Sequence, residues 1–319
     1  MNNKRFIEVQ HLIVSSSIDY TTDYICLELE RRGARYLRIN RDKFKEYEIC
    51  FSLDEEVLKI IIEKQIYLVR KDVASIYFRA PVFLRSHKAY TVEEQLYRSQ
   101  WSSFIRNLVL FKNARWINNP INVYGAENKL YQLYVAKKVG LEVPKSYVTN
   151  VVPDTIDCEK CYVIKSLDTA LFYDGEKEMF TYTTVLEGSA MESLSLSDAP
   201  VIMQEYVKDK VDLRVTVVDK KIFPVKILKN GMSIDGDWRK TPKNELSYVP
   251  ICLTEYVEQK ILCLMNELGL VFGGVDLACS NGKYYFIEVN PTGEWGWLLN
   301  TAKLPIDKAI VDYMEGQYE

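Results

Sequence analysis

The chain has 319 residues and a net charge of −3, and 48% of its residues are hydrophobic and 27% charged. This length and composition predict a globular protein of about two domains that folds without disulfides. The near balance of acidic and basic residues argues against bulk attraction to nucleic acid or to an anionic membrane. No run approaches transmembrane length, and the seven scattered cysteines indicate free thiols, so we expect a cytoplasmic protein.

The first third of the chain alternates predicted strands and helices, a pattern typical of a small α/β domain. An amphipathic segment that starts at Tyr20 predicts a helix ending at Gly33. Thr91 and Glu94 have the spacing of a capping box, which predicts the start of a long helix over 92–111. The runs that predict strands lie at 11–17, 35–40, 48–53, 57–63, 66–70 and 75–81.

The rest of the chain predicts β-rich regions separated by helices. Helices are expected over 123–139, closed by Gly140, and over 254–268, closed by Gly269. The pair Asn281–Gly282 stands between two β-rich runs and predicts a tight hairpin. The runs that predict strands lie at 146–150, 161–167, 178–185, 199–207, 211–219, 220–228, 270–280 and 283–290.

The terminal hairpin carries two acids and an amide. Asp276 lies on its first strand, and Glu288 and Asn290 lie two residues apart on the second, so this pair shares one face. Carboxylate and amide oxygens that converge need a cation, and hard oxygen ligands suit Mg²⁺. The sequence therefore predicts a magnesium site here, with a solvated strand face as the alternative. Trp295 and Trp297 follow, and they predict packing of the last helical segment against the sheet.

Two segments have features of a nucleotide site. Lys165 stands near the end of an apolar strand, where a lysine is well placed to meet phosphates. The following segment, 168–178, is expected to be a mobile loop covering those phosphates, with an ordinary hairpin as the alternative. The run from Gln204 to Val207 can offer backbone groups to a purine edge, with Glu205 near the adenine amino group or ribose. A solvated edge-strand lysine and an ordinary strand remain alternatives for Lys165 and for this run.

Arginines beside acidic residues form a third group of candidates. Asp212 and Arg214 share a strand face, and an arginine suits forked contact with phosphate or carboxylate. An ion pair within the sheet is the alternative. Arg239 stands next to Trp238 in the stretch DGDWRK and is a second candidate for holding a carboxylate, whereas the lysines around it are expected to form a solvated face.

The order of these pieces resembles the ATP-grasp superfamily. A strand ending in lysine, a loop, QEYV, D-x-R, an aspartate and E-x-N follow one another in a single direction. The resemblance implies a fold with α/β and α+β parts: an N-terminal α/β domain over 1–118, a central lid subdomain over 119–203 and a C-terminal subdomain over 204–319, with ATP clamped between the last two. The residues it implies are Asp276, Glu288 and Asn290 for Mg²⁺, and Lys129, Lys165, Gln204, Glu205, Tyr206, Val207 and Asp212 for ATP.

A narrower resemblance covers most of the chain. The stretches SIYFRAP, ENKLYQL, DLRVTVV, DWRK and IEVNPTGEWGWL are similar to those of the ligases that mature microviridin- and plesiocin-type graspetides. Arg79 matches that family, whereas many relatives carry a second Arg where this chain has Ala80. The resemblance implies a homodimeric ligase that uses ATP to join Asp or Glu side chains of a ribosomal precursor peptide to Ser, Thr or Lys side chains. Arg214 and Arg239 would hold the substrate carboxylate or its acyl phosphate.

Two other classes of function stay open from the sequence. An ATP-grasp ligase of the glutathione synthetase or glutamate-ligating kind would join free amino acids or small metabolites and need no leader peptide. A nucleotide-binding protein that docks a peptide without turnover is the third class, and the intact set of predicted metal ligands argues against it. With only two histidines in the chain, no Ser-His-Asp or Cys-His nucleophile is expected.

Overall fold

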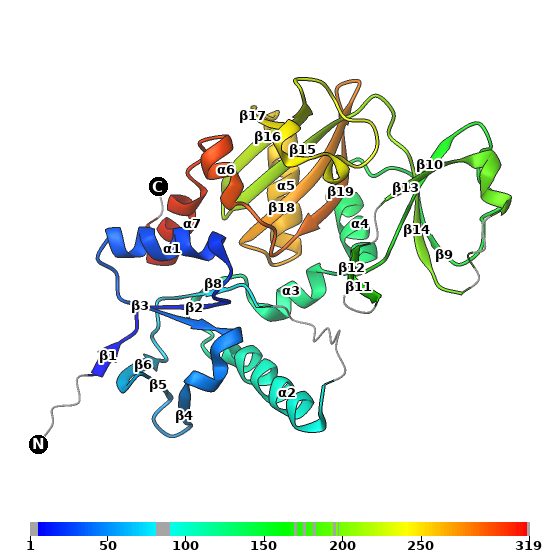
Figure 1. The fold of residues 1–319 in the computed structure, drawn as a ribbon. Coiled ribbons are helices and arrows are strands. Elements are labelled where there is room, and N and C mark those ends of the chain that lie inside the picture. Colours follow the sequence, from blue (N-terminus) through cyan, green and yellow to red (C-terminus); the bar gives the residue numbers. More distant parts are fainter. Residues whose placement is uncertain are drawn as a thin grey trace, which may run out of the picture.

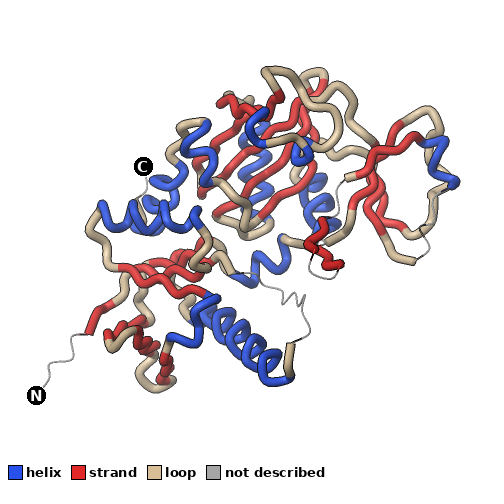
Figure 2. The backbone as a smooth tube through the Cα atoms, viewed as in Figure 1, coloured by secondary structure: helices blue, strands red, loops and turns tan. Residues whose placement is uncertain are grey.

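The computed structural model describes residues 6–317, apart from 81–89, 169–170, 175–176, 181–182, 194–195 and 197. The strands of the described residues form five sheets. Figure 1 shows an N-terminal region in blue and cyan, a small green sheet at the far end of the molecule, and a large yellow and orange sheet between them. Figure 2 shows that strands dominate the two parts that are green and yellow–orange in Figure 1, and that helices lie against the large sheet.

The N-terminal region is built on a parallel four-stranded sheet with the order β3-β2-β7-β8. Its strand β2 (His11–Ser15) is buried along its whole length, as expected for a strand covered on both faces. Leu12 packs toward the helix α2 and Ile13 toward α1 and α7, so successive residues of β2 enter different cores. The other elements are α1 (Tyr20–Arg31), β3 (Tyr36–Asn40), β7 (Ser75–Phe78), α2 (Val92–Asn107) and β8 (Arg115–Ile117).

A second four-stranded sheet, with the order β1-β6-β5-β4, completes this region. The elements are β1 (Phe6–Glu8), η1 (Arg41–Glu46), β4 (Glu48–Ser52), β5 (Val57–Ile62), β6 (Gln65–Arg70) and η2 (Leu108–Leu110). The predicted start of α2 is confirmed, because Thr91 Oγ1 accepts a hydrogen bond from the Glu94 N–H (3.2 Å). The helix ends at Asn107 rather than residue 111, because the chain tightens there into the 3₁₀ turn η2.

The large sheet is antiparallel and five-stranded, with the order β17-β16-β15-β18-β19. Helices α4 and α5 pack on one of its faces and share a hydrophobic core with β15, β18 and β19. Residues of α6 and α7 join a second core that links the large sheet to the N-terminal sheet. The elements are β15 (Val211–Val218), β16 (Lys221–Lys229), η4 (Trp238–Lys240), η5 (Lys243–Glu245), β17 (Leu246–Pro250), α5 (Glu255–Glu267), β18 (Phe272–Ser280), β19 (Lys283–Asn290), α6 (Gly296–Thr301) and α7 (Ile306–Glu315).

The remaining part, which we call the lid sheet, is antiparallel with the order β13-β10-β14-β9. Its elements are β9 (Ser146–Thr149), β10 (Cys161–Lys165), β13 (Thr184–Glu187), η3 (Gly188–Ser193) and β14 (Val201–Glu205). In the described residues of 168–178 the structure has the hairpin that was the alternative to a mobile loop, because β11 (Leu171–Asp174) and β12 (Lys177–Phe180) pair there in antiparallel fashion. The covering of the phosphates by this segment stays a prediction. Residues 169–170 and 175–176 of that segment lie outside the described residues, as does Pro81 of the expected strand 75–81.

One predicted turn is present, and one predicted helix is divided in two. The hairpin at Asn281–Gly282 is confirmed, and both residues have positive φ (50° and 75°), as an Asn-Gly turn between twisted strands requires. The single helix over 123–139 is wrong: the chain forms α3 (Pro120–Ala126) and α4 (Lys129–Lys138). Asn128 separates them, because its Nδ2 donates to the carbonyls of Tyr124 (2.8 Å) and Gly125 (3.1 Å) and so closes α3.

The domain boundaries at 118/119 and 203/204 stay predictions. Within the described residues, no helix is both long and apolar enough to cross a lipid bilayer.

A buried asparagine joins the N-terminal region to the large sheet. Asn118 follows β8 and is 2% exposed. Its Nδ2 donates to the carbonyls of Phe272 (2.7 Å) and Pro291 (2.8 Å), and its Oδ1 accepts from the N–H groups of Val271 and Phe272 (2.9 Å each). One side chain therefore satisfies the backbone at the start of β18 and just beyond the end of β19, which fixes the two strand ends together.

We expect the substitution Asn118→Leu to lower the free energy of unfolding by about 3 kcal/mol or more, because each buried backbone group left unpaired costs about 1–3 kcal/mol. The measurement is the Tm by circular dichroism. The matched control is Asn122→Leu, whose half-buried side chain donates a single bond to the Gly269 carbonyl (2.7 Å). An equal loss of Tm in both variants would contradict the role given to Asn118.

Candidate active site

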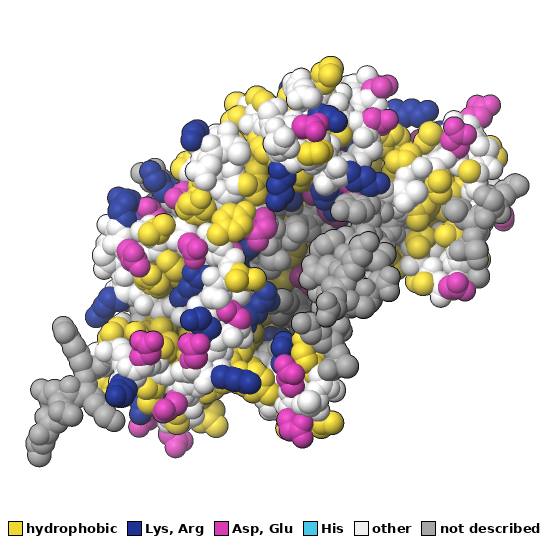
Figure 3. All heavy atoms as spheres, viewed as in Figure 1, with side chains coloured by type: hydrophobic (Ala, Val, Ile, Leu, Met, Phe, Trp, Pro, Cys, Tyr) yellow, Lys and Arg dark blue, Asp and Glu magenta, His cyan; other side chains and the backbone are white. Residues whose placement is uncertain are grey.

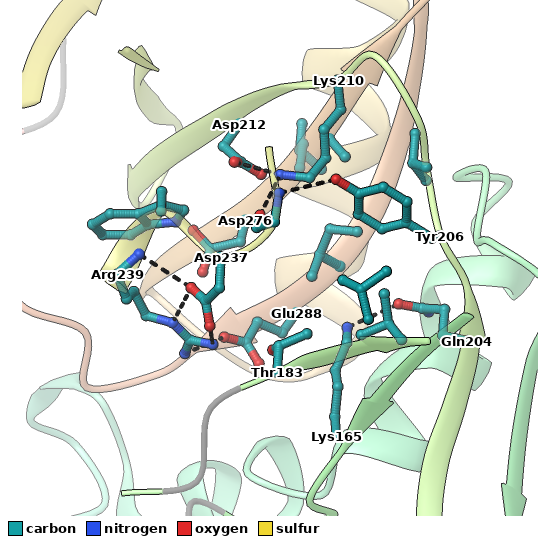
Figure 4. A pocket seen from close by; sticks show the side chains of 18 of the residues that line it. Lys165, Thr183, Gln204, Tyr206, Lys210, Asp212, Asp237, Arg239, Asp276 and Glu288 are labelled. Atoms are coloured by element: carbon teal, nitrogen blue, oxygen red, sulfur yellow. Dashed lines mark hydrogen bonds and ion pairs between the residues drawn. The ribbon is translucent and has the colours of Figure 1, made fainter. Parts of the chain in front are cut away.

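A cleft lies between the lid sheet and the large sheet, and residues of both sheets line it. Figure 4 shows Lys165 and Gln204 of the lid sheet on one side of it and Asp276 and Glu288 of the large sheet on the other. On the face drawn in Figure 3, Lys and Arg side chains gather over the large sheet near the centre of the molecule. The cleft thus joins charged residues that are far apart in the sequence.

The terminal hairpin places its two acids side by side. Asp276 of β18 is the direct register partner of Glu288 of β19, so both side chains leave the sheet on the same face. Both line the cleft. Asn290 shares the face of Glu288 at the end of β19; it is exposed, and its Oδ1 accepts a hydrogen bond from the Thr292 N–H (3.2 Å). Asn290 is not among the described residues that line the cleft.

Burial and neighbouring cations act in opposite directions on these two carboxyl groups. Burial raises the pKa of Asp276 to about 7, with Arg214 opposing the rise and Glu288 adding to it. Burial also disfavours the charged form of Glu288, but nearby cations outweigh it and lower its pKa. Those cations, in order of effect, are Lys129, Lys165, Arg239 and Arg214. Without a further cation, the protein therefore disfavours having both acids charged at neutral pH.

These residues fit a divalent cation. Asp276 Oδ1 is buried and accepts no hydrogen bond, although Arg214 Nη1 lies 3.3 Å from it, so this oxygen keeps a lone pair outside any hydrogen bond. Two carboxylates and an amide oxygen are the hard ligands that Mg²⁺ takes in phosphate-handling sites. The described residues hold no cluster of three or more His, Cys, Asp or Glu side chains of the kind that binds a metal. A metal would therefore rest on Asp276 and Glu288, with the amide of Asn290 as the remaining protein ligand in the prediction.

Arg214 is buried against the hairpin. Its Nη1 lies 3.3 Å from Asp276 Oδ1 and donates to the Gly274 carbonyl (3.2 Å). The guanidinium fits there because residue 274 has no side chain: a Cβ at Gly274 would lie 2.6 Å from Arg214 Nη1. Asp212, two residues earlier on β15, is paired with Lys210 Nζ at 2.5 Å, and burial raises its pKa despite that lysine. Sequence reasoning missed Lys210, which has no motif of its own.

Arg239 of η4 also lines the cleft and lies near Glu288. It is half exposed, and its Nε and Nη2 donate to the two carboxylate oxygens of Asp237 (2.9 and 2.8 Å). Its Nη1 lies 3.9 Å from Glu288 Oε1. The fork from Asp237 fixes the plane of the guanidinium and leaves Nη1 toward Glu288. Asp237 was not predicted from the sequence, although it stands two residues before Arg239 in DGDWRK.

Lys165 ends β10 inside the cleft. Burial lowers its pKa to about 8, against the attraction of Glu288. Its Nζ donates to Gln204 Oε1 (2.8 Å), and Gln204 Nε2 in turn donates to Ser146 Oγ (2.8 Å). The side chain of Gln204 therefore orients the lysine. Lys129 lies at the start of α4, and its Nζ donates to the Ser166 carbonyl (3.1 Å), one residue beyond Lys165.

The segment after β14 has the free backbone group that the purine prediction needs. The N–H groups of Glu205 and Tyr206 are used, because they donate to the carbonyls of Lys145 and Cys161 (2.8 Å each). The Val207 N–H has no backbone partner among the described residues, and Val207 lines the cleft. The Glu205 carboxylate pairs with Lys160 (2.8 Å). The nucleotide contacts predicted for this segment stay predictions, and Val207 is the residue best placed for one.

The sequence model of the RimK-like ATP-grasp domain matches residues 126–314. The chain belongs to the RimK-like ATP-grasp family. The predicted fold class is thereby confirmed, with the cleft lying between the two β-rich parts of that fold. The ATP-grasp resemblance seen in the sequence is confirmed as well.

Two solved structures match almost the whole of this chain. The macrocyclase MdnC from Microcystis aeruginosa MRC, bound with precursor peptide MdnA, is 25% identical and matches with a TM-score of 0.80 over 97% of this chain and 100% of that one. A RiPP-associated ATP-grasp ligase from Chryseobacterium gregarium, in complex with ADP and a leader and core peptide, is 23% identical with a TM-score of 0.81, and the match covers 98% of each chain.

Curated relatives match a shorter part of the chain. A probable alpha-L-glutamate ligase 1 from Shewanella sp. (strain W3-18-1) is 25% identical over 205 residues, which is 62% of this chain and 66% of the relative. The match thus spans just under two thirds of the length of that relative.

Arg79, which matched the graspetide motif in the sequence, is engaged inside the protein. Its Nε donates to Asp19 Oδ2 (2.9 Å) and its Nη2 to Glu294 Oε1 (2.6 Å). Thr21 also donates to Glu294. These bonds tie the end of β7 to the loop that follows β19, so Arg79 holds the N-terminal region against the strand that carries Glu288.

We expect the affinity for metal-free ADP to fall as the pH rises above about 8, by up to about tenfold per pH unit, because Lys165 then loses the charge that attracts phosphate. The measurement is calorimetric titration from pH 7 to 9.5. Lys165→Met should bind weakly and without this pH dependence, whereas Lys243→Met, which changes an exposed lysine, should keep it. The same pH profile in Lys165→Met and the unmodified protein would contradict the assignment.

Proposed function

We propose that this chain is an ATP-dependent ligase that joins Asp or Glu side chains of a ribosomal precursor peptide to Ser, Thr or Lys side chains. The products would be macrocyclic esters or amides. The observation that carries the proposal is the pair of half-buried acids, Asp276 and Glu288, surrounded by cations in a cleft between two sheets. Such a site suits a reaction in which the protein binds a nucleoside triphosphate and neutralises the charge of its phosphates.

The chemical problem is that a carboxylate is a poor electrophile. In the proposed reaction a substrate carboxylate oxygen attacks the γ-phosphorus of ATP, ADP leaves, and an acyl phosphate forms. A hydroxyl or amine of the peptide then attacks the acyl carbon, inorganic phosphate leaves, and the attacking group loses a proton. Mg²⁺ bound at Asp276, Glu288 and Asn290 would supply positive charge to the phosphates.

The chain's own residues would position the reactants. Lys165 stands at the lid side of the cleft, held by Gln204, and would neutralise phosphate oxygens. Arg239 keeps one Nη toward the acids while Asp237 fixes its plane, so it would hold the incoming carboxylate or its acyl phosphate. Arg214 is close to Asp276 and would balance charge at that acid. Positioning and charge neutralisation are the main contributions a protein makes to phosphoryl transfer.

The peptide substrate is supported by the extent of the structural likeness. The peptide-bound macrocyclase matches along almost the whole of this chain, including the N-terminal region. A second candidate function, ligation of free glutamate, is favoured by the curated relatives, whose match covers 62% of the chain. A homodimer and a cytoplasmic location are further parts of the proposal.

Intact mass spectrometry separates these two functions. With ATP, Mg²⁺ and a precursor peptide rich in Thr and acidic residues, we expect the peptide to lose one water for each new bond, with one ADP formed per water lost. With free glutamate as the only acceptor, we expect no ADP above background. ADP formation with glutamate and an unchanged peptide mass would instead support the glutamate ligase.

We expect Glu288→Gln to abolish ADP formation while the fold is kept, because the substitution preserves shape and removes the charge that would hold the metal. Activity should fall by at least about a hundredfold, as expected for losing a metal ligand and its charge balance. The control is Glu267→Gln, which makes the same change at the exposed last residue of α5. Full activity in Glu288→Gln would remove Glu288 from the site.

A further inference from the structure

The two predicted metal ligands of β19 flank one residue, Val289, whose backbone is held from outside the sheet. β19 is an edge strand of the large sheet and pairs with β18. The backbone groups of an edge strand that point outward need partners from elsewhere. Gln132 of α4 satisfies both groups of Val289: its Oε1 accepts from the N–H (2.9 Å), and its Nε2 donates to the carbonyl oxygen (2.8 Å).

The amide of Gln132 is itself fixed. The residue is 3% exposed, and its Nε2 also donates to the Ala126 carbonyl at the end of α3 (2.5 Å). A rotated amide would place its oxygen against two carbonyl oxygens and its NH₂ against an N–H. Only one orientation therefore satisfies all three bonds. The amide acts on Val289 as a short piece of neighbouring strand would act.

We propose that Gln132 is a positioning residue for the metal site, because it clamps the peptide between Glu288 and Asn290 and so sets the direction of both side chains. The inference rests on the proposed function, since it assumes that these residues bind the metal. Successive side chains of a strand leave on opposite faces, so fixing the backbone at one residue fixes the face and tilt of its two neighbours. The Val289 side chain is 2% exposed in the core, which holds the strand from the opposite face.

Helix α4 brings charge to the same place. Lys129 stands three residues before Gln132, so the two lie on one face of the helix. Lys129 is the cation with the largest effect on Glu288. One turn of α4 therefore supplies both the clamp on β19 and a positive charge that favours ionised Glu288.

The test replaces Gln132 by Met, which keeps the length and volume of the side chain and removes its three hydrogen bonds. With saturating ADP, we expect the Kd for Mn²⁺, followed by electron paramagnetic resonance, to rise about tenfold or more, as for the loss of residues that orient metal ligands. The matched control is Trp116→Phe, which removes a buried side-chain bond to the Phe111 carbonyl (3.1 Å) in the N-terminal region. It should lower the Tm and leave the Kd for Mn²⁺ unchanged.

Each outcome decides a separate question. An unchanged Kd in Gln132→Met, or an equal rise in Trp116→Phe, would overturn the positioning role. A Glu288→Gln variant that binds Mn²⁺ like the unmodified protein would instead remove the metal site itself. Should Gln132→Met not fold, hydrogen exchange in the unmodified protein gives the answer. The Val289 amide should exchange as slowly as the amides that pair β19 with β18, and exchange at the rate of an open edge amide would overturn the clamp.

Discussion

The placement of two half-buried acids opposite each other on β18 and β19 is the constraint on which the rest of the site depends. Two like unit charges 4 Å apart repel by about 4 kcal/mol at an effective dielectric constant of 20. Asp276 and Glu288 are tolerated because cations approach them from several elements: Arg214 from β15, Arg239 from η4 and Lys165 from the lid sheet. Under the proposed function, the same balance would favour a ligand that brings both phosphates and a divalent cation.

The arrangement of sheets explains why the acids and the phosphate-binding lysine come from different parts of the chain. The antiparallel hairpin β18–β19 carries the acids, and β10 carries Lys165 across the cleft, oriented by Gln204 of β14. Because each part has its own core, the distance between Lys165 and the acids depends on how the lid sheet stands over the large sheet. Binding a nucleotide between them would join the two parts through charge, without rearranging either core.

The alternation of side chains and the tight turn explain which features could be predicted. The two-residue turn at Asn281–Gly282 fixes the register of the terminal hairpin as far as Leu277 and Phe286, and the period of two places Glu288 and Asn290 on one face. A register shift beyond Leu277, which the sequence does not predict, brings Asp276 opposite Glu288. By contrast, Gln132 acts on a backbone 157 positions away, and nothing around it in the sequence indicates that contact. The break between α3 and α4 was missed for a local reason, since Asn128 caps α3 within an otherwise helical pattern.

The three arginines that the sequence analysis singled out differ in how far each remains available to a substrate. Arg79 donates from Nε to Asp19 and from Nη2 to Glu294, so its charge is already paired within the protein. These bonds join the N-terminal region to the loop after β19. Arg214 is buried and contacts Asp276, within the sheet. Arg239 is half exposed, and its fork with Asp237 uses Nε and Nη2 and leaves Nη1 3.9 Å from Glu288. An incoming carboxylate would therefore meet Arg239 first, because pairing there requires no buried ion pair to break.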